Sequence, residues 1–268
     1  MEFWKLDGTH YLSDYKTSFI NGELEHPYHL PPVRCKVCRE SIGQGFTLPY
    51  ICPTGLRKKF TDPADATMEE FNHITEKVKV TVKKRGLSGS LVQPWSALQP
   101  AFLDIPSKPT ADFLWPGFNP VVSPRIREKL ESLKVQDVAF AEVTLRKVGK
   151  RAANLPAPIP STGEPEDIIN EVPTMLLPKT KQRYFEVCIY GRSAPPPGRE
   201  VLSVCSTCGT KKFNWTRGTK LIMTESLWTG HDIFILETTL HVLVTDKLKR
   251  ELQKLRPTNV EFTRFPSA

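Results

Sequence analysis

The sequence predicts an α+β fold made of two related strand-helix-strand halves. Three observations predict this fold: a helix-and-strand pattern that occurs twice at a constant spacing, one Cys-x-x-Cys pair in each half, and a Pro-rich segment between the halves. At 268 residues, with 39% hydrophobic and 25% charged residues, the chain is long enough for one large core or two small cores.

The repeated pattern spans residues 122–140 and 244–262, which is a constant offset of 122 residues. Each copy begins with a residue that can cap a helix, Ser123 or Thr245, continues with apolar residues on one helix face, and enters a strand after a short polar turn. We expect helices at 123–134 and 245–256, with Leu130 and Leu252 buried at matching positions. Chance is the alternative, because amphipathic helix-turn-strand units are common.

Composition divides the chain into three parts. Residues 1–150 form an N-terminal half with the first cysteine pair, residues 151–182 a Pro-rich linker or excursion, and residues 183–268 a C-terminal half with the second pair. The middle part contains the run LPAPIP, whose composition is typical of exposed linkers.

Two further segments of the N-terminal half have recognisable patterns. Thr67 and Glu70 have the spacing of a capping box and predict a helix, for which Gly86 offers a C-terminal cap. Residues 94–120 contain six prolines among large aromatic side chains. We expect an ordered loop layer there, without regular structure, whose rings mainly pack inside the fold.

Cys35 and Cys38 form one Cys-x-x-Cys turn, and Cys205 and Cys208 form a second. Such a turn directs two sulfurs to the same side, and two turns together supply the four thiolates of a tetrahedral Zn²⁺ site. We therefore predict one structural zinc ion held by these four cysteines, a zinc-knuckle site similar to a zinc ribbon that joins the two halves. Arg39 follows the first pair, where a glycine would favour the turn.

Other roles for these cysteines stay open. The 166 residues between Cys38 and Cys205 far exceed the separation usual in zinc ribbons, so loss of the metal with the fold retained, or a redox or disulfide role, are alternatives. The remaining cysteines, Cys52 and Cys188, lie in apolar runs and are expected to be buried. Histidines at 26 and 29 could replace a ligand, although we expect them to pack or to face solvent.

Charge and hydropathy limit the possible partners and the cellular location. Lys and Arg outnumber Asp and Glu by 37 to 29, and the resulting charge of +8 permits contact with nucleic acid or acidic surfaces. The densest basic run, residues 77–85, is expected to be a solvated helix face. No apolar run is long enough to span a bilayer and the start lacks the pattern of a signal peptide, so we expect a cytoplasmic protein.

The order of these features resembles the double-CXXCG family of bacterial immunity proteins over nearly the whole chain. The resemblance is carried by Leu-Pro-x-Val-x-Cys-x-x-Cys at 30–38, by Cys-x-x-Cys-Gly at 205–209 and by the segments 244–248 and 260–262. It implies a non-enzymatic protein that binds and neutralises a cognate toxin of a polymorphic toxin system used between kin. Arg39 departs from the family pattern in the first motif.

A zinc-ribbon nucleic-acid-binding protein is the alternative function, because residues 211–217 combine basic and aromatic side chains just after the second pair. The sequence contains none of the motifs of serine hydrolases, zinc metalloproteases, P-loop NTPases or dinucleotide-binding enzymes, so no enzyme is predicted. A zinc-dependent hydrolase would also need an open coordination position, and four cysteines leave none. The identity of the toxin and the oligomeric state do not follow from the sequence.

Overall fold

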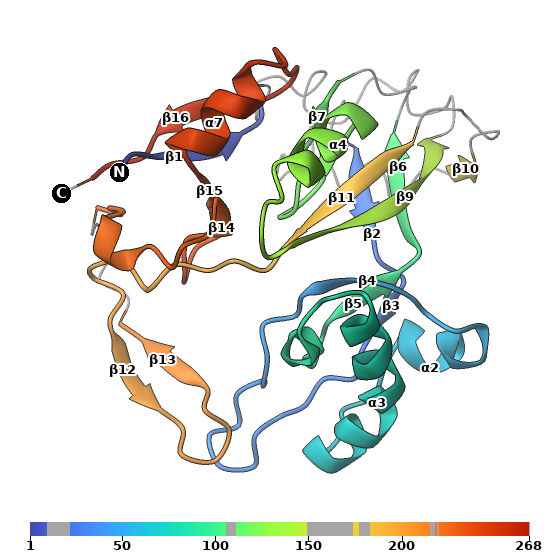
Figure 1. Ribbon diagram of the computed structural model, residues 1–268. Helices are drawn as coiled ribbons and strands as arrows, with labels where there is room; N and C mark the ends of the chain where they lie inside the picture. Colours follow the sequence, from blue (N-terminus) through green and yellow to red (C-terminus); the bar gives the residue numbers. More distant parts are fainter. Residues whose placement is uncertain are drawn as a thin grey trace, which may run out of the picture.

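The computed structural model describes residues 1–9, 22–105, 111–148, 174–176, 183–214, 218 and 220–267 (Figure 1). The described chain is a mixed α and β structure with four sheets. Its helices are α2 (Arg57–Thr61), α3 (Met68–Lys84), α4 (Pro124–Ser132) and α7 (Asp246–Gln253), with 3-10 turns η2 (Thr54–Leu56), η3 (Gly89–Leu91) and η4 (Glu225–Leu227).

The two larger sheets carry the repeated pattern. One has four antiparallel strands in the order β14 (Ile233–Ile235), β15 (Val242–Thr245), β1 (Phe3–Asp7), β16 (Glu261–Arg264). The other has seven strands, in the order β2 (Glu23–Glu25), β6 (Ala101–Ile105), β9 (Val138–Val148), β11 (Tyr184–Ile189), β8 (Val121–Val122), β7 (Phe113–Leu114), and β10 (Thr174–Leu176) also pairs with β9. Its pairs are antiparallel except β6 with β9.

Two smaller sheets position the cysteine pairs. A three-stranded sheet has the order β3 (Tyr28–His29), β5 (Ala97–Gln99), β4 (Thr47–Ile51), and the first pair lies in the loop between β3 and β4. A two-stranded hairpin, β12 (Val201–Val204) with β13 (Lys211–Phe213), holds the second pair in its turn. Figure 1 shows the tip of this hairpin beside the loop that leads into β4.

The predicted helix after Thr67 is present as α3. Thr67 accepts a hydrogen bond from the backbone N–H of Glu70, and the Glu70 carboxylate accepts one from the backbone N–H of Thr67, so the capping box is confirmed. The helix runs on to Lys84 and buries Phe71 and Val78 against β4 and its neighbours. Its basic C-terminal residues face solvent, as expected.

One of the two largest hydrophobic clusters lies where α4 and α7 cover the two larger sheets. It contains Ile126 and Leu130 from α4 and Leu248 and Leu252 from α7. Leu130 is 3% exposed and Leu252 is 1% exposed, which confirms the predicted burial of both. The two helices therefore belong to one shared core.

The expectation of an irregular loop layer at residues 94–120 was wrong. Strands β5, β6 and β7 lie in this segment and are almost entirely buried. The prolines of the described part lie at strand ends or between strands, where no ladder hydrogen bond needs their missing N–H, so they interrupt strands without preventing them. Among the rings, Phe113 is buried and stacks on Trp115, whereas Trp95 and Phe118 are exposed.

The division of the chain at 151–182 stays a prediction, because this segment lies outside the described residues apart from β10. Strands from either side of it nevertheless share sheets: β11 pairs with β8 and β9, and β1 pairs with β15 and β16. Within the described residues, none of the helices has the length and apolar character that crossing a bilayer requires.

Candidate metal centre

The two cysteine pairs form the same backbone turn. We call residues 35–40 the first knuckle and residues 205–210 the second knuckle. In the first, the N–H of Cys35 donates to the carbonyl of Glu40 at 3.0 Å and the N–H of Arg39 donates to the carbonyl of Cys35 at 2.9 Å. In the second, Cys205 and Thr210 make the equivalent bond at 2.9 Å, and Gly209 donates to Cys205 at 2.8 Å.

Arg39 adopts the conformation that the glycine adopts in the other knuckle. Its φ is +63°, and the φ of Gly209 is +72°. The left-handed region costs a residue with a Cβ roughly 1–2 kcal/mol. Arg39 therefore keeps the knuckle geometry, and the presence of a Cβ where the second knuckle has a glycine is a local energetic cost.

The knuckles bring the four cysteine sulfurs together although the pairs lie far apart in the sequence. All four Sγ atoms lie within 4.8 Å of one another, with Cys35 to Cys205 at 3.9 Å and Cys38 to Cys208 at 3.7 Å. A tetrahedral ion with metal–sulfur bonds of about 2.3 Å places its sulfurs about 3.8 Å apart. A disulfide would need about 2.05 Å, and all the cysteines are free thiols.

Hydrogen bonds from nearby N–H and hydroxyl groups lower the thiol pKa at three of the four cysteines. N–H groups of Cys38 and Val37 lower the pKa of Cys35, those of Cys208 and Thr207 lower the pKa of Cys205, and the hydroxyl and N–H of Thr210 lower the pKa of Cys208. The N–H of Glu40 acts in the same direction on Cys38, but burial and the neighbouring thiols outweigh it and raise its pKa to about 12. Four adjacent thiolates repel one another, and a divalent cation removes that repulsion.

Comparison with protein-family models and with curated proteins gives no match. The resemblance to the double-CXXCG proteins therefore rests on the residues that carry it. Of these residues, Cys35, Cys38, Cys205 and Cys208 are the four that the structure assembles. We refer to them as the four-cysteine centre.

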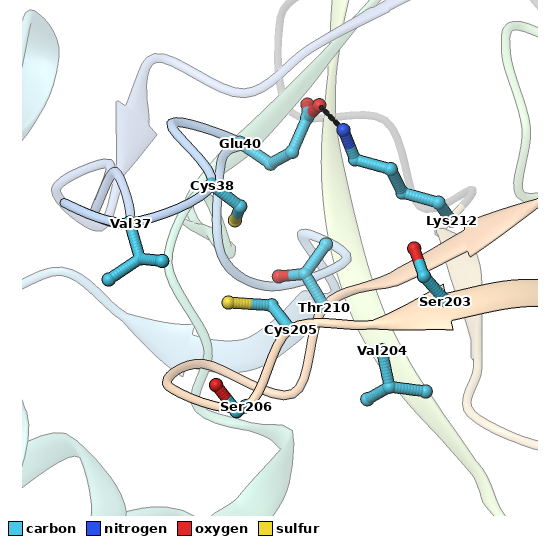
Figure 2. Close-up of a pocket in the computed structure, with 9 residues that line it drawn as sticks. All are labelled: Val37, Cys38, Glu40, Ser203, Val204, Cys205, Ser206, Thr210 and Lys212. Atoms are coloured by element: carbon cyan, nitrogen blue, oxygen red, sulfur yellow. Dashed lines mark ion pairs between the residues drawn. The ribbon is translucent and has the colours of Figure 1, made fainter.

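The centre lies at the surface. Cys35 is buried, and the other three cysteines are partly exposed. A pocket of about 420 Å³ opens beside Cys38 and Cys205 and is also lined by Val37 and Val204. Figure 2 shows Cys38 and Cys205 on the two facing knuckles.

Two contacts of the centre could not be read from the cysteine spacing. Glu40 of the first knuckle and Lys212 of β13 form an ion pair at 3.2 Å (Figure 2). Thr210 Oγ1 lies 3.1 Å from Cys208 Sγ, so that its hydroxyl can donate to the thiolate. In the sequence, the hydroxyl of Thr210 two residues after Cys208 could have indicated a hydrogen bond to that cysteine. The ion pair could not have been predicted, because it depends on how the first knuckle and β13 meet in space.

The other candidate ligands lie elsewhere. Cys52 and Cys188 are fully buried, as expected, and burial raises the pKa of each thiol. His26 Nε2 lies 2.8 Å from the buried carboxylate of Glu186, which also accepts a hydrogen bond from Asn119. The candidate metal site at the knuckles therefore consists of four cysteines, and no described histidine or carboxylate belongs to it.

Proposed function

We propose that the four-cysteine centre binds one Zn²⁺ ion and that this ion is structural. The support is the sulfur geometry, which matches a tetrahedral thiolate site, and the preference of Zn²⁺ for such sites. Cys35 and Cys38 would hold one side of the ion, and Cys205 and Cys208 the other. The bound ion would supply cross-linking and charge neutralisation, because four protein ligands leave no position for a substrate.

The same proposal includes the relatedness of the two halves. Helices α4 and α7 begin after Ser123 and Thr245, which lie 122 residues apart, and Leu130 and Leu252 are buried at that same offset. Each half also supplies one knuckle with the same backbone hydrogen bonds. Two copies of one unit, each with half of a metal site, account for both observations.

For the whole protein we propose an immunity protein that neutralises a cognate toxin by stoichiometric binding. The observation that carries the proposal is the set of four clustered cysteines: with Zn²⁺ bound they would stiffen a binding scaffold and leave no open metal position for turnover. The resemblance to double-CXXCG immunity proteins points the same way. Protection would then end when toxin exceeds this protein.

The test is titration against the product of the neighbouring gene, taken as the candidate toxin. Co-expression should restore growth, and inhibition of the purified toxin should be complete at a one-to-one ratio, with nanomolar or tighter affinity. The complex should bury roughly 1,600 Å² or more, as stable protein complexes do. Permanent inactivation of excess toxin by a trace of this protein would instead show catalysis and refute the binding mechanism.

A zinc-ribbon nucleic-acid-binding protein is the second candidate. Lys211 and Lys212 are exposed on β13 next to the centre, which favours contact with phosphates. Lys212 is, however, already paired with Glu40. Binding to mixed-sequence DNA or RNA that weakens steeply between about 50 and 200 mM salt would favour this second function over the first.

A further inference from the structure

Two four-stranded units in this structure have the same strand order. In one sheet the order is β14-β15-β1-β16, and in the other, read from its β7 edge, it is β7-β8-β11-β9. Every pairing within both series is antiparallel. In both, a helix connects the second strand to the fourth, and a strand from elsewhere in the chain lies between these two.

The pairing register is also the same. Val122 lies opposite Phe185, and 122 residues later Val244 lies opposite Trp4. On the other side of the central strand, Glu142 lies opposite Phe185, and 122 residues later Arg264 lies opposite Trp4. One offset therefore holds on both sides of the central strand, which makes β1 the counterpart of β11.

An uncommon backbone conformation recurs at the same offset. Lys134 and Asp137 follow α4 with φ of +53° and +54°, and Arg256 and Asn259 follow α7 with φ of +48° and +56°. Positive φ is uncommon in residues other than glycine. Its occurrence at two pairs of matching positions distinguishes the units from ordinary helix-strand connections.

The order of features along the chain shows where each central strand comes from. The N-terminal half runs β1, first knuckle, β7, β8, α4, β9, and the C-terminal half runs β11, second knuckle, β14, β15, α7, β16. Yet β1 lies in the sheet of the C-terminal half and β11 lies in that of the N-terminal half (Figure 1). We infer that residues 1–148 and 183–268 are two copies of one unit that have exchanged their first strands, so that each half completes the other.

Contacts between matching positions support this arrangement. Lys129 of α4 forms an ion pair at 2.7 Å with Glu251 of α7, its own counterpart at the offset of 122. At the knuckles, the sulfur of Cys35 contacts that of Cys205 and the sulfur of Cys38 contacts that of Cys208, so each cysteine again contacts the residue at the matching position. A residue meets its own counterpart where a two-fold axis passes, so both the helix pair and the four-cysteine centre lie close to a pseudo-two-fold axis.

The exchange makes the two halves binding partners of each other. Leu6 of β1 and Val187 of β11 occupy matching positions, and both are buried in the one cluster that α4 and α7 share. Without β1, the sheet of the C-terminal half loses its central strand, and without β11 the other sheet loses its own. This inference rests on the relatedness of the two halves proposed above and does not require zinc binding or toxin neutralisation.

The first test uses a matched pair of variants in the full chain. Leu6→Ala should speed amide hydrogen exchange in β15 and β16 of the C-terminal half, and Val187→Ala should speed it in β8 and β9 of the N-terminal half. Each substitution should thus increase hydrogen exchange in the half that does not contain the substituted residue in the sequence. Exchange that increases in the variant's own half, in β8 and β9 for Leu6→Ala, would overturn the inference.

The second test cuts the folded chain. A protease site inserted between Pro160 and Ser161 allows cleavage of the folded full-length protein, followed by sizing with and without a metal chelator. Exchanged strands should keep the two fragments in one particle even without metal, and denaturant alone should separate them. If each unit kept its own first strand, cleavage would release two folded fragments in native buffer, with or without the chelator. That result would overturn the inference.

Discussion

Arg39 occupies a position where the second knuckle has a glycine, and its left-handed backbone conformation is strained. Arg39→Gly removes strain of roughly 1–2 kcal/mol, which the greater freedom of glycine in the unfolded chain offsets by about 0.4–1 kcal/mol. We expect the variant to be more stable by about 0.5–1 kcal/mol, measured by urea unfolding with metal bound.

Gly209→Ala is the matched control for this prediction. A Cβ at Gly209 would meet nothing within 4 Å, so the substitution tests backbone conformation alone. It should lower stability by about 0.5–1 kcal/mol, the reverse of the change at Arg39. Equal effects of the same sign at the two positions would show that the knuckles do not share one turn.

At the scale of elements, we expect the hairpin β12–β13 to depend on the four-cysteine centre, two cysteines of which lie in its turn. All four residues of β12 are exposed, and a two-stranded hairpin is marginally stable by itself. Chelation of the metal should therefore speed amide hydrogen exchange in residues 201–213, while β11, whose six residues are all buried, stays protected. Unchanged exchange in the hairpin after proven metal removal would contradict a structural role for the ion.

The contact between α4 and α7 should depend on pH. Hydrogen bonds from Lys129 and then Lys254 lower the pKa of Glu251 to about 2. Because the folded-state pKa lies below the unfolded value, the contribution of Glu251 to stability is complete above about pH 4.5 and disappears as the pH falls towards 2. The stability difference between wild type and Glu251→Gln should therefore shrink from pH 6 to pH 3.

Urea unfolding at each pH measures this difference, and loss of metal at low pH affects both proteins alike. Glu128→Gln, at an exposed glutamate on α4, is the control and should change stability little at any of these pH values. A difference for Glu251→Gln that is constant across the range would show that the lysines do not select the charged carboxylate.

At the scale of the whole molecule, the proposed zinc ion would add to a fold that has hydrophobic cores of its own. We expect about one equivalent of zinc per chain, and Cys208→Ser should lower both the zinc content and the unfolding midpoint. Structural zinc contributes on the order of 10 kcal/mol in small metal-dependent domains. Here none of the four buried clusters contains a cysteine of the four-cysteine centre, so the variant should stay folded.

Cys52→Ala is the control for metal content. Cys52 is fully buried away from the centre, so this variant should lose stability yet keep its zinc. Wild type without zinc, together with a normal unfolding midpoint for Cys208→Ser, would show that the four-cysteine centre is not a metal clasp.

The sequence by itself determined what depends on near neighbours in the chain. The capping box of α3, the positions of α4 and α7 and the two Cys-x-x-Cys turns follow from hydrogen-bonding patterns and periodicities that span a few residues. It also indicated that four particular cysteines would meet, because each pair offers half of a tetrahedral site.

Only the tertiary structure decided which strands pair. Proline content argued against strands at 94–120, yet β5, β6 and β7 form there because their side chains are buried by partners distant in the sequence. The placement of β1 beside β15 and of β11 beside β8 has no local signal, since neither FWKLD nor YFEVCI contains a pattern that specifies one sheet over the other. Strand pairing depends on contacts between residues that are far apart in the chain. Local sequence patterns do not indicate which of these distant segments lie next to each other in space.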